Sequence, residues 1–149
     1  MIMRAEHLQH GELMRLMGLD IGEKRIGVAL SDPEHILARG LRVVRRRSRK
    51  ADMALMASLV EEHEVDKIIV GHPLRLDGRA GEQARRIESY AADLGAALGI
   101  PVVLWDESYS TRRAREAMIE AGRRRKERRQ RLDAVAAAVI LQDYMDSAR

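Results

Sequence analysis

Three acidic residues stand at the edges of apolar segments of the sequence, where a charge is costly to bury. Asp20 interrupts the apolar segment 15–21, and Glu107, with Asp106 beside it, follows the apolar run VVLW. Asp133 opens a long apolar segment near the end of the chain. Burying a carboxylate costs several kcal/mol unless a partner compensates its charge, so such acids mark either a structural pairing or a functional site.

The chemistry that this set of acids predicts is metal-dependent phosphodiester cleavage. The carboxyl ends of neighbouring parallel strands converge on one crevice, and like charges that meet there need a divalent cation to stay ionised together. Oxygen ligands without a cluster of His or Cys favour Mg²⁺ or Mn²⁺, and such ions beside cationic side chains cleave phosphodiester bonds. We therefore predict Asp20, Glu107 and Asp133 as both catalytic residues and metal ligands.

Each acid also has a structural interpretation when it is taken alone. Asp106 and Glu107 can be a loop pair or charges at a helix N-terminus, and Asp133 can be a first-turn aspartate that the helix dipole favours. A structural role is hardest to assign to Asp20. The joint placement of the acids is what favours the metal site.

Basic residues are concentrated in two stretches of a chain whose net charge is only +4. Residues 39–50 contain seven basic residues and no acid, and residues 123–131 contain seven basic residues and one acid. This pattern predicts an anionic polymer as partner, although solvated loops are the alternative. The sequence has no Phe and 3% aromatic residues, which argues against a base-stacking surface. We expect 123–131 to be a mobile loop that orders on substrate, because its like charges repel.

The cations that we predict to bind nucleic acid come from the hairpin beside Asp20 and from the segment that precedes the last helix. The hairpin cations can equally be solvated turn residues. The predicted set is Lys24, Arg25, Arg112, Arg123, Arg124, Arg125, Arg128 and Arg129.

Hydrophobic periodicity places these residues on alternating strands and helices. The segment 36–47 is predicted to become basic and to leave the sheet, and Gly122 to end a helix that Ser110 or Thr111 caps. The predicted strands are 15–21, 25–32, 36–47, 66–73 and 101–107, and the predicted helices are 50–63, 80–98, 110–122 and 132–146.

This order predicts an α/β fold with a mixed sheet, in which three antiparallel strands precede βαβ crossovers and helices cover both faces. We expect residues 1–14 to be a flexible N-terminal extension and residues 15–149 to be a single domain. The chain has no cysteine, and no apolar run approaches the roughly 18 residues of a membrane helix. The first residues lack the apolar core of a signal peptide, so we expect a cytoplasmic protein.

Four stretches resemble, in order and spacing, the signature stretches of the YqgF/RuvX family. They are GLDIGEKRIGVALSD, IIVGHPLRLDGRAGEQA, VVLWDESYSTRRA and LDAVAAAVILQDYMD, and the resemblance runs from about residue 16 to residue 146. The family consists of RNase H-like proteins described as Holliday junction resolvases and as pre-16S rRNA nucleases. The resemblance therefore implies an RNase H-like fold and an acidic metal centre.

The acids of the family motifs match acids of this sequence. The strand-one aspartate matches Asp20, the acids of the family's DER segment match Asp106 and Glu107, and the aspartate that opens the last helix matches Asp133. The threonine that follows DER matches Thr111.

The sequence also departs from the family pattern. His72 and Arg75 replace the Leu and Asn of VGLPLNMDG, and Ser108 replaces the Arg of DER. An arginine beside the acids could contact the scissile phosphate, and Arg112 or Arg113 can take over that contact. The segment VGHP offers no acid at the end of the central strand, where many RNase H-like nucleases have one, so Glu107 must supply that ligand.

Three functions compete at this point. The first is a metal-dependent endonuclease on structured nucleic acid, with pre-16S rRNA favoured over a Holliday junction by the resemblance. The second is a non-catalytic RNA- or ribosome-binding protein, which Ser108 makes plausible. The third is a kinase-type ATPase, which a length of 149 residues disfavours because such enzymes need two such domains, and which ATP binding would support. A monomer and a homodimer both stay open.

Overall fold

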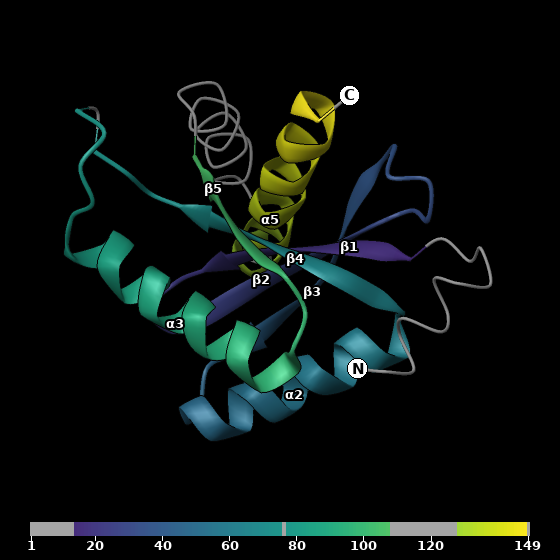
Figure 1. Cartoon of the computed structure of the whole chain (residues 1–149), viewed down its shortest axis with the longest axis horizontal. Coiled ribbons are helices and arrows are strands. Elements are labelled where there is room, and N and C mark those ends of the chain that lie inside the picture. The colour runs from purple at the N-terminus through teal and green to yellow at the C-terminus, as the bar shows by residue number, and fades with distance from the viewer. Residues whose placement is uncertain (1–13, 76, 108–127, 149) are drawn as a thin grey trace.

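The computed structural model describes residues 14–75, 77–107 and 128–148, with side chains in the last segment from residue 134 onward. Its centre is a five-stranded sheet with the strand order β3-β2-β1-β4-β5 (Figure 1). The strands are β1 (Arg15–Ile21), β2 (Arg25–Ser31), β3 (Ala38–Arg45), β4 (Val65–His72) and β5 (Val102–Asp106).

The pairing of the strands makes the sheet mixed. β1 and β2 form a tight antiparallel hairpin in which the backbone N–H of Gly22 donates to the carbonyl oxygen of Arg25 at 2.8 Å, and β3 adds to β2 in antiparallel direction. β4 pairs parallel with β1, and β5 pairs parallel with β4. The carboxyl ends of β1, β4 and β5 therefore lie along the same edge of the sheet.

Helices cover both faces of this sheet, with α2 (Arg49–Glu62) and α3 (Glu82–Leu98) on one face and α5 (Arg128–Ser147) on the other (Figure 1). The Ser48 hydroxyl accepts a hydrogen bond from the Ala51 backbone N–H and caps α2, and Gly99 ends α3 in the left-handed conformation at φ 65°.

Side-chain alternation along the strands divides the interior into two cores. Met17, Leu19 and Ile21 of β1 pack with α2 and α3, whereas Leu16 of β1 packs with α5. Asp20 lies between Leu19 and Ile21, so it belongs to the face that α5 covers. A strand in the middle of the sheet, buried on both faces, thus carries one carboxylate toward α5.

The predicted α/β fold is confirmed, and each predicted strand and helix within the described residues is present at nearly the predicted bounds. The predicted helix over 110–122 and the extension 1–14, apart from Met14, lie outside the described residues, and the extension stays a prediction. No helix in the described part of the chain has the length and apolarity to cross a membrane.

Two local predictions were wrong. The third strand does not leave the sheet where it becomes basic, because Arg45 is still the register partner of Arg25. As an edge strand, β3 can extend its arginines into solvent without losing its pairing. α5 begins at Arg128, so residues 128–131 are helical rather than a loop. Arginine is a good helix former, and the apolar face that follows packs the helix onto the sheet.

The close approach of α5 to β1 depends on Gly18. A Cβ at this position would lie 2.8 Å from the Cβ of Leu141 and 2.9 Å from the carbonyl oxygen of Ala137, so the Gly18→Ala variant must push α5 away. We expect it to lose about 1–3 kcal/mol of unfolding free energy in a denaturant titration.

The matched control for this variant is Gly95→Ala, within α3. A Cβ there meets only the Cγ2 of Val102, at 3.7 Å, and alanine is the better helix former. We expect this control to gain about 0.5–1 kcal/mol. Equal effects of the two substitutions would contradict the tight contact between α5 and β1.

Candidate functional site

The first acid of the candidate site is Asp20, near the carboxyl end of β1. Its residue is 6% exposed, and it lies on the face of the sheet that α5 covers. Leu19 is the register partner of Val70, and the residues that follow these partners are Asp20 in β1 and Gly71 in β4. Asp20 and Gly71 therefore lie side by side, at the spacing of about 4.8 Å that separates neighbouring strands.

The second acid, Glu107, directly follows β5 and extends over Gly71. Its backbone N–H donates to the carbonyl oxygen of His72 at 3.1 Å, which holds the chain against β4 after the strand has ended. A Cβ on Gly71 would lie 2.7 Å from Oε1 of Glu107 and 2.6 Å from Cδ1 of Ile140. The absence of a side chain at residue 71 thus makes room for the Glu107 carboxylate on the α5 side of the sheet, next to the strand that carries Asp20.

The third acid, Asp133, lies in α5, and only its position in the helix is described. It precedes Ala137 by one helical turn, and it precedes Ile140 by two turns. Both of these residues pack on the sheet. By helical spacing, Asp133 shares their helix face.

Asp106 takes a different direction from Glu107. Trp105 packs with the α5 core, so alternation along β5 places Asp106 on the opposite face of the sheet, where it is exposed. Of the two adjacent acids that the sequence offered, Glu107 alone extends toward Asp20.

The donor set at this edge fits a hard divalent cation. Asp20, near the end of β1, and Glu107, after β5, supply carboxylate oxygens on either side of β4, and carboxylate oxygen is the ligand type that Mg²⁺ and Mn²⁺ prefer. Among the side chains that the structure describes, no group of three His, Cys, Asp or Glu residues is close enough to form a complete metal site. A third ligand would have to come from elsewhere, and Asp133 is the predicted one.

His72 belongs to the other face of the sheet. It alternates with Gly71, and its Nε2 lies 2.7 Å from Oε2 of Glu88 in α3, at hydrogen-bond distance. His72 is therefore a partly buried residue at the end of a strand that packs against α3. Glu88 was not singled out in the sequence, because nothing in its helical context distinguishes it from other surface acids.

Of the predicted nucleic-acid-binding cations, two belong to the described hairpin. Lys24 is exposed in the β1–β2 turn, and Arg25 is partly buried at the start of β2. Arg128 and Arg129 form the start of α5, without described side chains. The other four predicted cations lie outside the described residues: Arg112, Arg123, Arg124 and Arg125. Ser108, Thr111 and Arg113 also lie outside them.

The mixed sheet and the helix α5 that crosses one of its faces have the RNase H-like fold. The fold is similar to that of Thermus thermophilus RuvC in complex with a Holliday junction substrate, with a TM-score of 0.58, 16% identity, and coverage of 91% of this chain and 95% of that chain. It is also similar to the fowlpox virus Holliday junction resolvase, with a TM-score of 0.52, 16% identity, and coverage of 91% and 100%.

Sequence comparison identifies the family within this class. The family described as "RuvX: Holliday junction resolvase" matches residues 14–147, and the chain belongs to it. The chain is 47% identical over 134 residues to a protein of Syntrophus aciditrophicus named "Putative pre-16S rRNA nuclease", covering 90% of this chain and 89% of the relative. It is 46% identical over 136 residues to a protein of the same name from Myxococcus xanthus, covering 91% and 90%. Members of this family are hydrolases of phosphodiester bonds.

The geometry at Gly71 predicts that a single methyl group there impairs the site. In the Gly71→Ala variant the added Cβ displaces the Glu107 carboxylate, and a displacement of about 1 Å in an active site can cost 10²-fold in rate. We expect the cation-dependent cleavage rate to fall by roughly 10²-fold.

A double-mutant cycle separates this effect from general damage to the fold. If Gly71→Ala acts through Glu107, it causes no further loss in a Glu107→Gln background. Independent, multiplicative losses of rate in the double variant would show that the methyl group acts elsewhere, for instance by moving α5 at Ile140.

Proposed function

We propose that the protein is a metal-dependent endonuclease that cleaves structured nucleic acid, and that its substrate is the 5′ segment of pre-16S rRNA. The observation that carries the proposal is the placement of Glu107 over Gly71, directly beside the strand position of Asp20. Two carboxylates on one face and at one sheet edge are suited to hold a divalent cation against a phosphate.

Each acid has a proposed role in this reaction. Asp20, Glu107 and Asp133 hold Mg²⁺ or Mn²⁺, with Asp20 provided by the central strand β1 and Glu107 by the end of β5, on the other side of β4. A divalent cation bound there supplies Lewis-acid stabilisation of the charge that develops on the phosphoryl oxygens. Because Asp20 is almost inaccessible to solvent, its carboxylate lies in a low-dielectric surrounding and would attract a bound cation more strongly than an exposed carboxylate does.

The choice of RNA rests on the relatives at 47% and 46% identity, whose shared name refers to pre-16S rRNA. The second candidate substrate is a Holliday junction, because the family description names that activity. Nucleic acid is the proposed partner in either case, with Lys24, Arg25 and the cations before the last helix as backbone contacts. The cytoplasmic location and the choice between monomer and homodimer stay predictions.

The first test compares Asp20→Asn with Asp106→Asn. The Asp20 substitution removes a ligand charge at constant shape, so we expect cleavage in Mn²⁺ to fall roughly 10²–10³-fold or more, as for other groups that stabilise reaction charge. Asp106 is the adjacent acid to Glu107 but faces the other side of the sheet, so the Asp106→Asn variant should cleave as the wild type does. Binding of nucleic acid should stay the same or become tighter in Asp20→Asn, since a repulsive carboxylate is removed.

The substrate is tested with a precursor 16S rRNA 5′ segment and a synthetic four-way DNA junction, each incubated with the wild type and with Asp20→Asn. We expect the wild type to cut the RNA at discrete positions in preference to the junction. Cleavage of the junction alone would overturn the RNA proposal and support junction resolution. If neither substrate is cut in an Asp20-dependent way, the nuclease proposal fails and binding without cleavage becomes the better account.

A further inference from the structure

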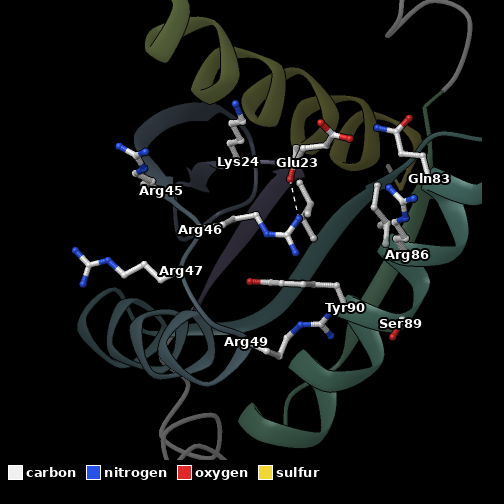
Figure 2. Close-up of a pocket in the computed structure, with 13 residues that line it drawn as sticks. Glu23, Lys24, Arg45, Arg46, Arg47, Arg49, Gln83, Arg86, Ser89 and Tyr90 are labelled. Carbon is white, nitrogen blue, oxygen red and sulfur yellow. Dashed lines mark hydrogen bonds between the residues drawn. The ribbon is translucent and has the colours of Figure 1, made fainter.

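A basic pocket of about 920 Å³ lies at the tip of the β1–β2 hairpin, on the face of the sheet that α2 and α3 cover (Figure 2). Its wall is formed by the hairpin turn, the junction between β3 and α2, and the start of α3. Glu23 is the acid among its lining residues, and its cations are Lys24, Arg45, Arg46, Arg47, Arg49 and Arg86. This concentration of arginine indicates a site for an anion.

Buried polar contacts hold the floor of this pocket in place. Asp52 is 3% exposed and accepts hydrogen bonds from the Tyr90 hydroxyl at 3.2 Å and from the Arg47 backbone N–H at 3.0 Å. Arg46 donates from Nη1 to the Gly22 carbonyl oxygen at 2.8 Å, which ties the junction to the hairpin. Burial and the nearby Asp52 carboxylate raise the pKa of Tyr90 above its usual range, so its hydroxyl remains a donor.

The cations of the pocket are not all neutralised by acids. Arg46 lies 4.0 Å from Asp52, Arg86 lies 2.5 Å from Glu82, and Arg49 pairs with Asp93. The exposed side chains of three others form no salt bridge to any acid in the described part of the chain: Lys24, Arg45 and Arg47. Figure 2 shows the side chains of Arg45 and Arg47 directed away from Tyr90, so the positive charge that remains available to a ligand lies along the rim of the pocket.

The geometry around Tyr90 indicates which part of a nucleic acid the pocket suits. The guanidinium carbon of Arg46 lies 5.0 Å from the centre of the Tyr90 ring, and that of Arg49 lies 4.7 Å from it. Figure 2 shows the two guanidinium groups on opposite sides of the ring. Since both faces of the ring are covered, no base can stack on it, and the donors of the arginines remain suited to phosphate.

The pocket also lies next to the candidate metal site. Ile21 and Gly22 line it, and they directly follow Asp20 in β1. At about 3.4 Å per residue, Asp20 and Gly22 are only about 7 Å apart along the chain, although the acids lie on the α5 face and the pocket on the other. A nucleic-acid strand that passes over the hairpin tip can reach both.

We propose that the basic pocket binds the sugar–phosphate backbone of the nucleic-acid substrate next to the bond that is cut, and that it does so without reading the bases. This inference rests on the proposed nuclease function, because it assigns the pocket to the same substrate. The pocket positions the strand over the hairpin tip, and the acids on the other face act on the phosphate that this positioning presents.

The test measures binding of a fluorescent precursor rRNA segment as a function of salt, in the Asp20→Asn background so that cleavage does not interfere. The variant Arg45→Gln/Arg47→Gln removes two exposed cations at the rim of the pocket and leaves the contacts of Asp52 and Tyr90 intact. Each lost phosphate contact reduces the slope of log K against log salt by about 0.7–0.9, so we expect a reduction of about 1.4–1.8. Oligo(A) and oligo(U) of equal length should show the same reduction.

The matched control is Lys67→Gln/Arg85→Gln, which removes two cations outside the pocket and outside the basic stretch 39–50. We expect its slope to stay within about 0.3 of the parent value, well under the change for one phosphate contact. Equal slopes for the two double variants, or no change in either, would overturn the role of the pocket. An effect on oligo(A) alone would overturn recognition without bases.

The binding result is independent of the nuclease proposal. If the wild type cleaves no substrate but the pocket variant still flattens the salt dependence, the proposed function fails and only the binding of a nucleic-acid backbone by the pocket stands. If the wild type cleaves in an Asp20-dependent way but the slope does not change, the pocket assignment fails and the proposed function stands.

Discussion

Two carboxylates brought together beneath a helix are the constraint on which the rest of this structure depends. Asp20 is nearly buried in the central strand, and Glu107 reaches the same face over Gly71. Like charges at such a position have to be offset by a cation or by hydrogen-bond donors, and the surrounding fold fixes where the two acids lie. The parallel pairing of β1, β4 and β5 does so, because it fixes the strand ends at one edge.

The packing of α5 follows from the same constraint. Gly18 lets the helix approach β1, and Gly71 leaves room for both Ile140 and the Glu107 carboxylate. The helix therefore covers this face of the sheet, and Asp133 directly precedes Ala134, which lies close to Gly40 of β3. The opposite face has a separate core and a separate basic pocket, so the proposed metal site and the proposed site of substrate positioning lie on two sides of one strand end.

Much of this organisation could be predicted from the sequence because hydrophobic periodicity reports which faces are buried. The strands, the crossovers and the shared edge of Asp20 and Glu107 follow from that pattern. The role of Gly71 and the contact of His72 with Glu88 could not be predicted, because both depend on which side chains meet across elements. The pocket escaped prediction for the same reason, since Lys24, Arg47 and Arg86 come from three separate segments. The predictions for the arginine-rich segments of β3 and α5 were wrong, because repulsion between the arginines is weaker than strand pairing in β3 and helix packing in α5.

The central claim is that the acids at the strand ends form one metal site, and a titration of folding stability with Mn²⁺ tests it without any substrate. A ligand that binds only the folded state adds about 2.7 kcal/mol of unfolding free energy at 100 times its Kd. We expect Mn²⁺ to stabilise the wild type and the Asp106→Asn variant in this way. The Asp20→Asn, Glu107→Gln and Asp133→Asn variants should each lose most of that gain. Equal stabilisation of all five proteins, or none in the wild type, would contradict the claim.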